Sequence, residues 1–258
     1  GILSPLFWIP EADLGRGYFQ MNALVVLGFL SLVLAVVVLH PFKPFGEEPL
    51  FGASALWAGF VSCFLYYVAV WCERWNLARV AATAALATCG AALLMAGPEL
   101  IVGLGPLPYR SVLVIAALLS SSLLLGWSLI AMLLGHWYLV APGLNFRHLV
   151  VFCWVLLATV VLRLLTVAAT LLSAWQVDAI ADPHPLRLLT LIEGQGMFFW
   201  FRLLWGLAIP LLLALMSLHC ARQRSNQSAT GILYVLVVGT FIGEITALYL
   251  TVTTGVPA

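Results

Sequence analysis

Apolar residues fill most of this chain in seven long runs, and short groups of polar residues separate each run from the next. At 1.5 Å of rise per residue, about 20 apolar residues in an α-helix cross a hydrocarbon core of about 30 Å. The pattern predicts an all-α integral membrane protein, a bundle of about seven transmembrane helices. The expected helices lie near residues 20–40, 51–72, 77–97, 112–141, 148–174, 196–218 and 229–252.

The polar segments between these runs are short and carry no sign of a second domain. We find no low-complexity tract, no composition shift and no convincing internal repeat along the chain. The expected organisation is a single transmembrane helical domain that covers residues 1–258.

Composition strengthens the membrane assignment and limits the partners. Of 258 residues, 64% are hydrophobic and 8% are charged, whereas about 25% are charged in an ordinary soluble domain. The lipid bilayer is therefore the expected surrounding. The 11 basic residues are scattered and the net charge is +1, which excludes the charge pattern of a nucleic-acid-binding protein.

Basic residues in short loops predict the orientation, because Lys and Arg near helix ends are retained in the cytoplasm. One side has Lys43, Arg110 and Arg187, and the other side has six arginines. The bias predicts a cytoplasmic N-terminus, an outside C-terminus and a place in the bacterial inner (plasma) membrane. The six arginines are Arg16, Arg74, Arg79, Arg147, Arg222 and Arg224.

Several kinds of chemistry are excluded by missing residues. A retinal protein needs a lysine in its last helix to form the Schiff base, and the only lysine here is Lys43, in a loop. The chain has no Walker loop, no GxSxG, no HExxH and no CxxC motif. Asp178, Asp182 and His184 lie together in the longest outer loop, and we interpret them as solvated loop residues, so no metal site is predicted.

Three ionisable residues fall inside the expected helices, where charge is costly in lipid and usually faces protein or a water-filled cavity. They are Arg163, Arg202 and Glu244. Counted from the outer helix ends, their depths agree within roughly 8 Å. They are candidates for a quinone-binding or proton-carrying site. The alternative is a structural ion pair that joins three helices.

A pattern of small residues precedes Glu244 directly. Gly239 and Gly243 are four residues apart, which places them on one helix face and permits close helix approach. We expect this face to pack within the bundle, rather than to form a dimer.

Two histidines lie at matched depth near the inner ends of the fourth and sixth helices. They are His136 and His219. Two neutral imidazoles from separate helices can hold one b-type haem, and Gly135 leaves room beside His136 for the macrocycle. The alternative is that both side chains reach the interface or bond to backbone carbonyls.

The loop from Arg222 to Gly231 is short, basic and rich in side-chain donors. It is a candidate docking surface for a cytoplasmic partner or for anionic lipid head groups. Its two arginines equally suit a simple positive-inside signal.

With so little mass outside the membrane, any chemistry must occur within the bundle or in a partner protein. The leading hypothesis is an integral membrane subunit of a respiratory or other electron-transfer complex, with a quinone site and one b-type haem as candidate cofactors and with other subunits as partners. If the chain is part of an enzyme, that enzyme is an oxidoreductase complex. The alternatives are a small transporter or proton or ion channel that uses the buried Arg and Glu residues, and a non-catalytic assembly or scaffold subunit.

Overall fold

The computed structural model describes residue 9 and residues 11–39, 50–102, 108–141, 144–178 and 195–254. Within these ranges the protein is helical and contains no strand. Seven helices are long and apolar enough to cross a membrane. The prediction of an all-helical membrane protein with about seven spans is therefore confirmed.

The contacts divide the chain into two compact units, Gly1–Val102 and Gly103–Ala258. The expectation of a single domain stays a prediction, and each unit is described by itself below.

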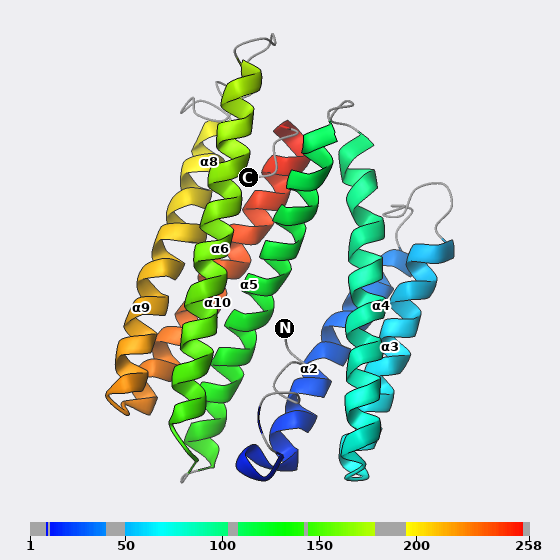
Figure 1. The fold of residues 1–258 in the computed structure, drawn as a ribbon, viewed down its shortest axis with the longest axis vertical. Helices are drawn as coiled ribbons and strands as arrows, with labels where there is room; N and C mark the ends of the chain where they lie inside the picture. The colour runs from blue at the N-terminus through cyan, green and yellow to red at the C-terminus, as the bar shows by residue number, and fades with distance from the viewer. Residues whose placement is uncertain are drawn as a thin grey trace. The chain divides into compact units, whose positions relative to one another are not determined.

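The described residues of the first unit form three helices, α2 (Glu11–Leu39), α3 (Leu50–Trp71) and α4 (Trp75–Val102). Helix α3 packs against both α2 and α4 (Figure 1). Helix α2 begins well before the predicted start near residue 20, because a polar first turn precedes the apolar span. Gly15 separates the two parts with a φ of 75°, a left-handed conformation that glycine adopts without a steric penalty.

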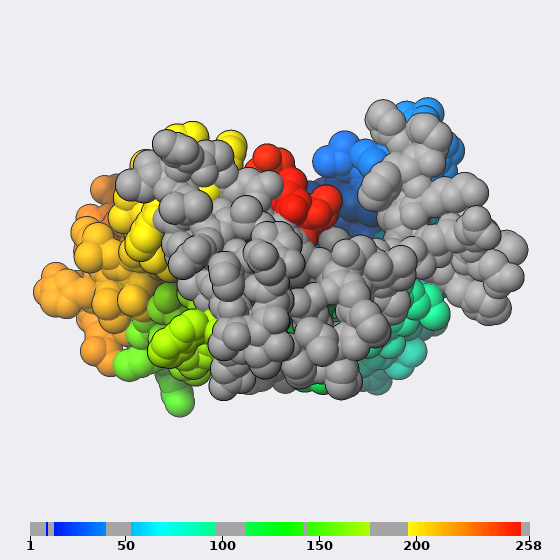
Figure 2. Space-filling model, turned by 90° about the horizontal axis from the view of Figure 1, so that it is seen from above, coloured from blue at the N-terminus to red at the C-terminus, as the bar shows by residue number. Residues whose placement is uncertain are grey.

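The second unit contains four membrane spans. They are α5 (Pro108–Val140), α6 (Arg147–Asp178), the segment α8 (Gln195–Leu203), η1 (Leu204–Ala208) and α9 (Ile209–Arg222), and α10 (Asn226–Thr254). Helix α5 packs on α6, α6 on α9, α9 on α10, and α10 on α5, so the spans close into a four-helix bundle. Figure 2 looks onto this unit from the end where α8 (yellow) begins and α10 (red) ends.

The sixth span is not one continuous α-helix, as the sequence pattern predicts, but is interrupted by a π-helical turn, η1. In this turn the N–H of Ile209 donates to the carbonyl of Leu204, five residues earlier. Pro210 follows directly and has no N–H, so it cannot donate to the carbonyl of Gly206 as an α-helix requires. The wider turn accommodates this missing donor, and such π-helical turns occur frequently at functional sites.

The orientation of the spans stays a prediction, and a reporter fusion tests it. Alkaline phosphatase fused after Ala258 is expected to be active, because the positive-inside bias places the C-terminus outside. A fluorescent protein that matures only in the cytoplasm is expected to stay dark at the same position. The opposite pair of results would show that the orientation is wrong.

Candidate functional site

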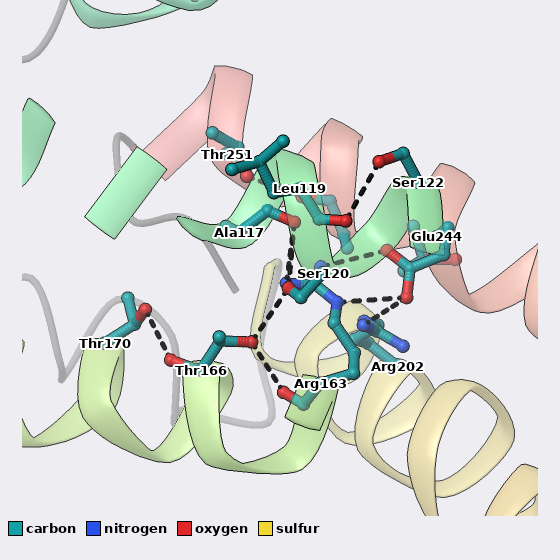
Figure 3. A network of polar contacts seen from close by, with 12 residues as sticks. Ala117, Leu119, Ser120, Ser122, Arg163, Thr166, Thr170, Arg202, Glu244 and Thr251 are labelled. Atoms are coloured by element: carbon teal, nitrogen blue, oxygen red, sulfur yellow. Dashed lines mark hydrogen bonds and ion pairs between the residues drawn. The ribbon is translucent and has the colours of Figure 1, made fainter. Parts of the chain in front are cut away.

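Three ionisable side chains from three helices meet inside the second unit. Arg163 comes from α6, Arg202 from α8 and Glu244 from α10, and Figure 3 shows their side chains pointing toward one another. They are 2%, 1% and 6% exposed, so their charges are shielded from the surrounding lipid. We call these three residues the charged triad.

Glu244 accepts hydrogen bonds from both arginines. Arg163 donates from Nε to Oε1 over 3.1 Å and from Nη2 to Oε2 over 2.9 Å, and Arg202 donates from Nη2 to Oε1 over 2.8 Å. Charge-assisted bonds of this kind are roughly twice as strong as bonds between neutral groups. The triad has two cations and one anion, so its formal charge is +1.

Helix α5 supports Arg163 from the remaining side. Nη1 of Arg163 lies 3.4 Å from the carbonyl oxygen of Ala117 and 3.5 Å from the hydroxyl of Ser120. Ser120 also shares a hydrogen bond of 3.0 Å with Thr166, one turn after Arg163. Every guanidinium nitrogen of Arg163 therefore has a partner, and all four spans of the unit take part in the site (Figure 3).

Arg202 differs from Arg163, because its Nε and Nη1 are buried without a hydrogen-bond partner. Leaving a buried donor unbonded costs about 1–3 kcal/mol, and more when the group is charged. Arg202 therefore has unused charged donors beside the only buried carboxylate among the described residues.

Two glycines make room for Arg202. A Cβ atom added to Gly206 would lie 2.1 Å from Nη1 of Arg202 and 2.8 Å from the Cα of Gly243. A Cβ atom added to Gly243 would lie 2.2 Å from the Cα of Gly206. The backbones of η1 and α10 are thus in direct contact, which brings Arg202 within reach of Glu244. The prediction that the glycine face of α10 packs within the bundle is confirmed.

Sequence analysis missed Gly206 and the α5 contacts of Arg163. A signal for Gly206 was present, because it follows Arg202 by four residues and therefore lies on the same helix face. No comparable signal marked Ala117 or Ser120. Backbone carbonyls and hydroxyl side chains occur in every apolar run, so nothing in the sequence distinguishes these two residues.

The two candidate haem ligands have separate hydrogen-bond partners. Nδ1 of His136 lies 3.2 Å from the hydroxyl of Tyr234 on α10, and Nε2 of His219 lies 2.9 Å from Nε2 of Gln223, the residue directly after α9. These bonds leave Nε2 of His136 and Nδ1 of His219 as the free ring nitrogens. The space predicted beside Gly135 for a macrocycle is filled by α10, since a Cβ atom added to Gly135 would lie 2.9 Å from Oγ1 of Thr230. The role of the two histidines as haem ligands stays a prediction.

The structure adds nothing on the outer-loop trio of acidic and histidine residues. Asp182 and His184 lie outside the described residues, and Asp178 is the last residue of α6. In the part of the chain that is described, no group of three His, Cys, Asp or Glu residues is placed to hold a metal ion.

Comparison with known proteins gives no family for this chain: no protein-family model, no curated protein and no solved structure matches it. Its function must therefore be argued from the charged triad and its surroundings.

Proposed function

We propose that the chain is a membrane subunit of a respiratory or other electron-transfer complex in the bacterial inner membrane, and that the charged triad binds a quinone. The observation that carries this proposal is the pair of unbonded donors on Arg202, buried at membrane depth. A quinone has carbonyl oxygens that accept such bonds, and its apolar ring and tail reach the site through the lipid.

The three residues of the triad would have different tasks. Arg202 donates to a carbonyl oxygen of the quinone. Arg163 holds the Glu244 carboxylate in place with two bonds. Because the triad carries an excess positive charge, it stabilises the negative charge that arrives with electrons in a water-poor interior. Glu244 is then the group that can carry a proton to the reduced oxygen, while a partner subunit supplies the electrons.

Quinone binding tests the proposal directly. A short-chain ubiquinone analogue is expected to quench the tryptophan fluorescence of the detergent-purified protein. Arg202→Gln should raise the Kd at least about tenfold, because a hydrogen bond from a charged donor contributes about 1.5–3 kcal/mol. This variant keeps the neutral pair of Arg163 and Glu244, so it should remain folded.

The matched control is Arg16→Gln in the first unit. Arg16 is also ion-paired, at 3.1 Å from Glu73, but its side chain is 45% exposed, and its loss should leave the Kd unchanged. Equal quinone affinity in the wild type and in Arg202→Gln would refute the quinone site.

A b-type haem between His136 and His219 remains part of the proposal, and a reduced-minus-oxidised visible spectrum tests it. Two imidazole ligands produce a sharp α-band. We expect this band to disappear in His136→Ala and in His219→Ala, and to persist in Tyr234→Phe, which removes only the hydroxyl next to His136. A spectrum without the band in the wild type would remove the haem and leave the quinone site to stand alone.

The π-helical turn favours a second candidate, a small transporter for an anion. Interrupted helices beside buried charges are a common feature of membrane transporters, and η1 follows Arg202 directly. Uptake of a labelled organic anion into proteoliposomes, lost in Arg202→Gln, combined with absent quinone binding would replace the electron-transfer proposal. Absence of both activities would point to a scaffold subunit.

A further inference from the structure

Two turns, one in each unit, have the same backbone pattern. After α3, the N–H of Glu73 donates to the carbonyl three residues back and the N–H of Arg74 to the carbonyl five residues back, over 3.2 Å and 2.9 Å. After α9, Arg224 and Ser225 repeat these bonds over 3.2 Å and 3.0 Å. This is the Schellman motif that ends many helices.

The key position of this motif is left-handed and is usually occupied by glycine. Here it holds Glu73, with a φ of 58°, and Arg224, with a φ of 60°. Both residues therefore carry backbone strain that glycine would avoid. A strained residue of this kind is a reason to look for a task of its side chain.

In the first unit the side chain at this position has a partner of opposite charge. Oε1 of Glu73 lies 3.1 Å from Nη1 of Arg16, and the Arg16 guanidinium lies over the ring of Trp71, 5.6 Å from its centroid. The strained carboxylate thus meets a cation that rests on an aromatic face.

In the second unit the corresponding side chain has an aromatic partner but no carboxylate. Arg224 lies over the ring of Phe146 at 6.0 Å, and Arg222 lies over the ring of Trp154 at 5.0 Å. Arg147, next to Phe146, begins α6 and is exposed. None of the three arginines has an ion-pair partner among the described residues. We call Arg147, Arg222 and Arg224 the basic cluster.

The aromatic contacts determine how this cluster can bind. Arginine favours stacking the flat face of its guanidinium on an aromatic ring, an arrangement in which the N–H groups stay available for another partner. Such a fork of donors fits the oxygens of a phosphate group. The cluster therefore offers charged donors that suit a phosphate group, and no carboxylate of the described residues pairs with them.

The position in the fold indicates where the anion comes from. The cluster lies where α6 begins and α9 ends, and both belong to membrane spans, so it lies at the level of the lipid head groups. Trp154, which supports Arg222, is 47% exposed on the outside of α6. The surface that presents Arg222 is therefore not covered by the rest of the described chain.

We propose that the basic cluster binds the phosphate head group of an anionic phospholipid. The bound phosphate supplies the negative charge that Arg224 and Arg222 lack in the second unit, as Glu73 supplies one for Arg16 in the first. This site is separate from the charged triad and does not depend on the proposed function.

Native mass spectrometry of the detergent-purified protein tests the proposal with phosphatidylglycerol and phosphatidylcholine of equal chain length. Phosphatidylglycerol should bind at least tenfold more tightly. In the double variant Arg222→Gln and Arg224→Gln its affinity should fall about 25-fold, since each arginine near a charged lipid surface accounts for about a factor of five. Arg16→Gln, the matched control, should change the affinity less than twofold.

Three results would overturn the proposal. They are equal binding of the two lipids, an unchanged affinity in the double variant, and an equal loss in Arg16→Gln. Inorganic phosphate at millimolar concentration serves as the competitor for a free-anion site. If phosphate displaces the lipid completely, the cluster binds a soluble anion and the assignment to a phospholipid is wrong.

Arg224→Gly gives a second, independent measurement. Glycine removes both the strain and the charge, so this variant should melt about 2 °C or more higher than the wild type in neutral detergent. Added phosphatidylglycerol should then stabilise it less than it stabilises the wild type. A lower melting temperature in neutral detergent, or an unchanged lipid effect, would contradict the proposed task of Arg224.

Discussion

Glu244→Gln is expected to lower the free energy of unfolding by about 3–5 kcal/mol, the range observed when a buried ion pair loses one partner. The substitution leaves Arg163 and Arg202 buried, 2% and 1% exposed, with no negative charge to hold them. Glutamine can accept a hydrogen bond, but it cannot balance either cation. Thermal unfolding in detergent and the yield of monodisperse protein measure the effect.

A second substitution should partly reverse this loss. Glu244→Gln together with Arg202→Gln restores the formal charge of the site to +1, as in the wild type, and removes the less well-bonded arginine. The double variant should therefore be more stable than Glu244→Gln alone. If the two losses simply add, the residues are not energetically coupled and the triad does not act as a unit.

The exposed ion pair of the first unit provides the matched control. Glu73→Gln removes a carboxylate that also bonds an arginine, but the Glu73 side chain is 67% exposed. Exposed pairs contribute at most about 1 kcal/mol, so this variant should melt close to the wild type. A loss as large as that of Glu244→Gln would show that burial is not the cause.

The membrane-spanning helices could be predicted from the sequence, because the length of an apolar run determines whether it can cross the bilayer. Each apolar run is long enough to span the bilayer, and the seven helices lie where the runs lie. The break in the sixth span could not be predicted this way. Leu204–Ala208 is as apolar as its neighbours, so hydropathy does not reveal the π-helical turn, and only the missing N–H of Pro210 hints at it.

For the candidate site, the sequence could predict the depth of each residue in the membrane but not the contacts between the side chains. Counting residues from the helix ends placed Arg163, Arg202 and Glu244 at similar depth, which the structure agrees with. Which atoms pair depends on how each helix is rotated and how closely the backbones approach, and these follow from contacts such as that of Gly206 with Gly243. Such contacts are set by tertiary packing and leave no periodic signal.

Gly243→Ala is the second substitution with a large expected effect. The new methyl group would lie 2.2 Å from the Cα of Gly206 and 3.0 Å from Nη1 of Arg202. The first of these atoms is backbone and cannot rotate away, so η1 and α10 must separate. We expect a loss of about 3 kcal/mol, at the upper end of the usual range for overpacking, measured by thermal unfolding.

Gly231→Ala on the same helix is the control. Nothing lies within 4 Å of the Cβ position at Gly231, and alanine stabilises a helix interior by up to about 1 kcal/mol relative to glycine. This variant should melt at or above the wild-type temperature. If both variants lose stability equally, the cause is a general sensitivity of α10 and not its contact with η1.

Gly243→Ala also distinguishes the structural role of the triad from its proposed quinone role. Separation of η1 from α10 moves Arg202 away from Glu244, whereas Arg163 reaches Glu244 from α6 and keeps its two bonds. Protein that remains folded should therefore bind the quinone analogue as weakly as Arg202→Gln does. If it binds as tightly as the wild type, Arg202 does not need Glu244 to hold the quinone, and the glycine contact only packs the bundle.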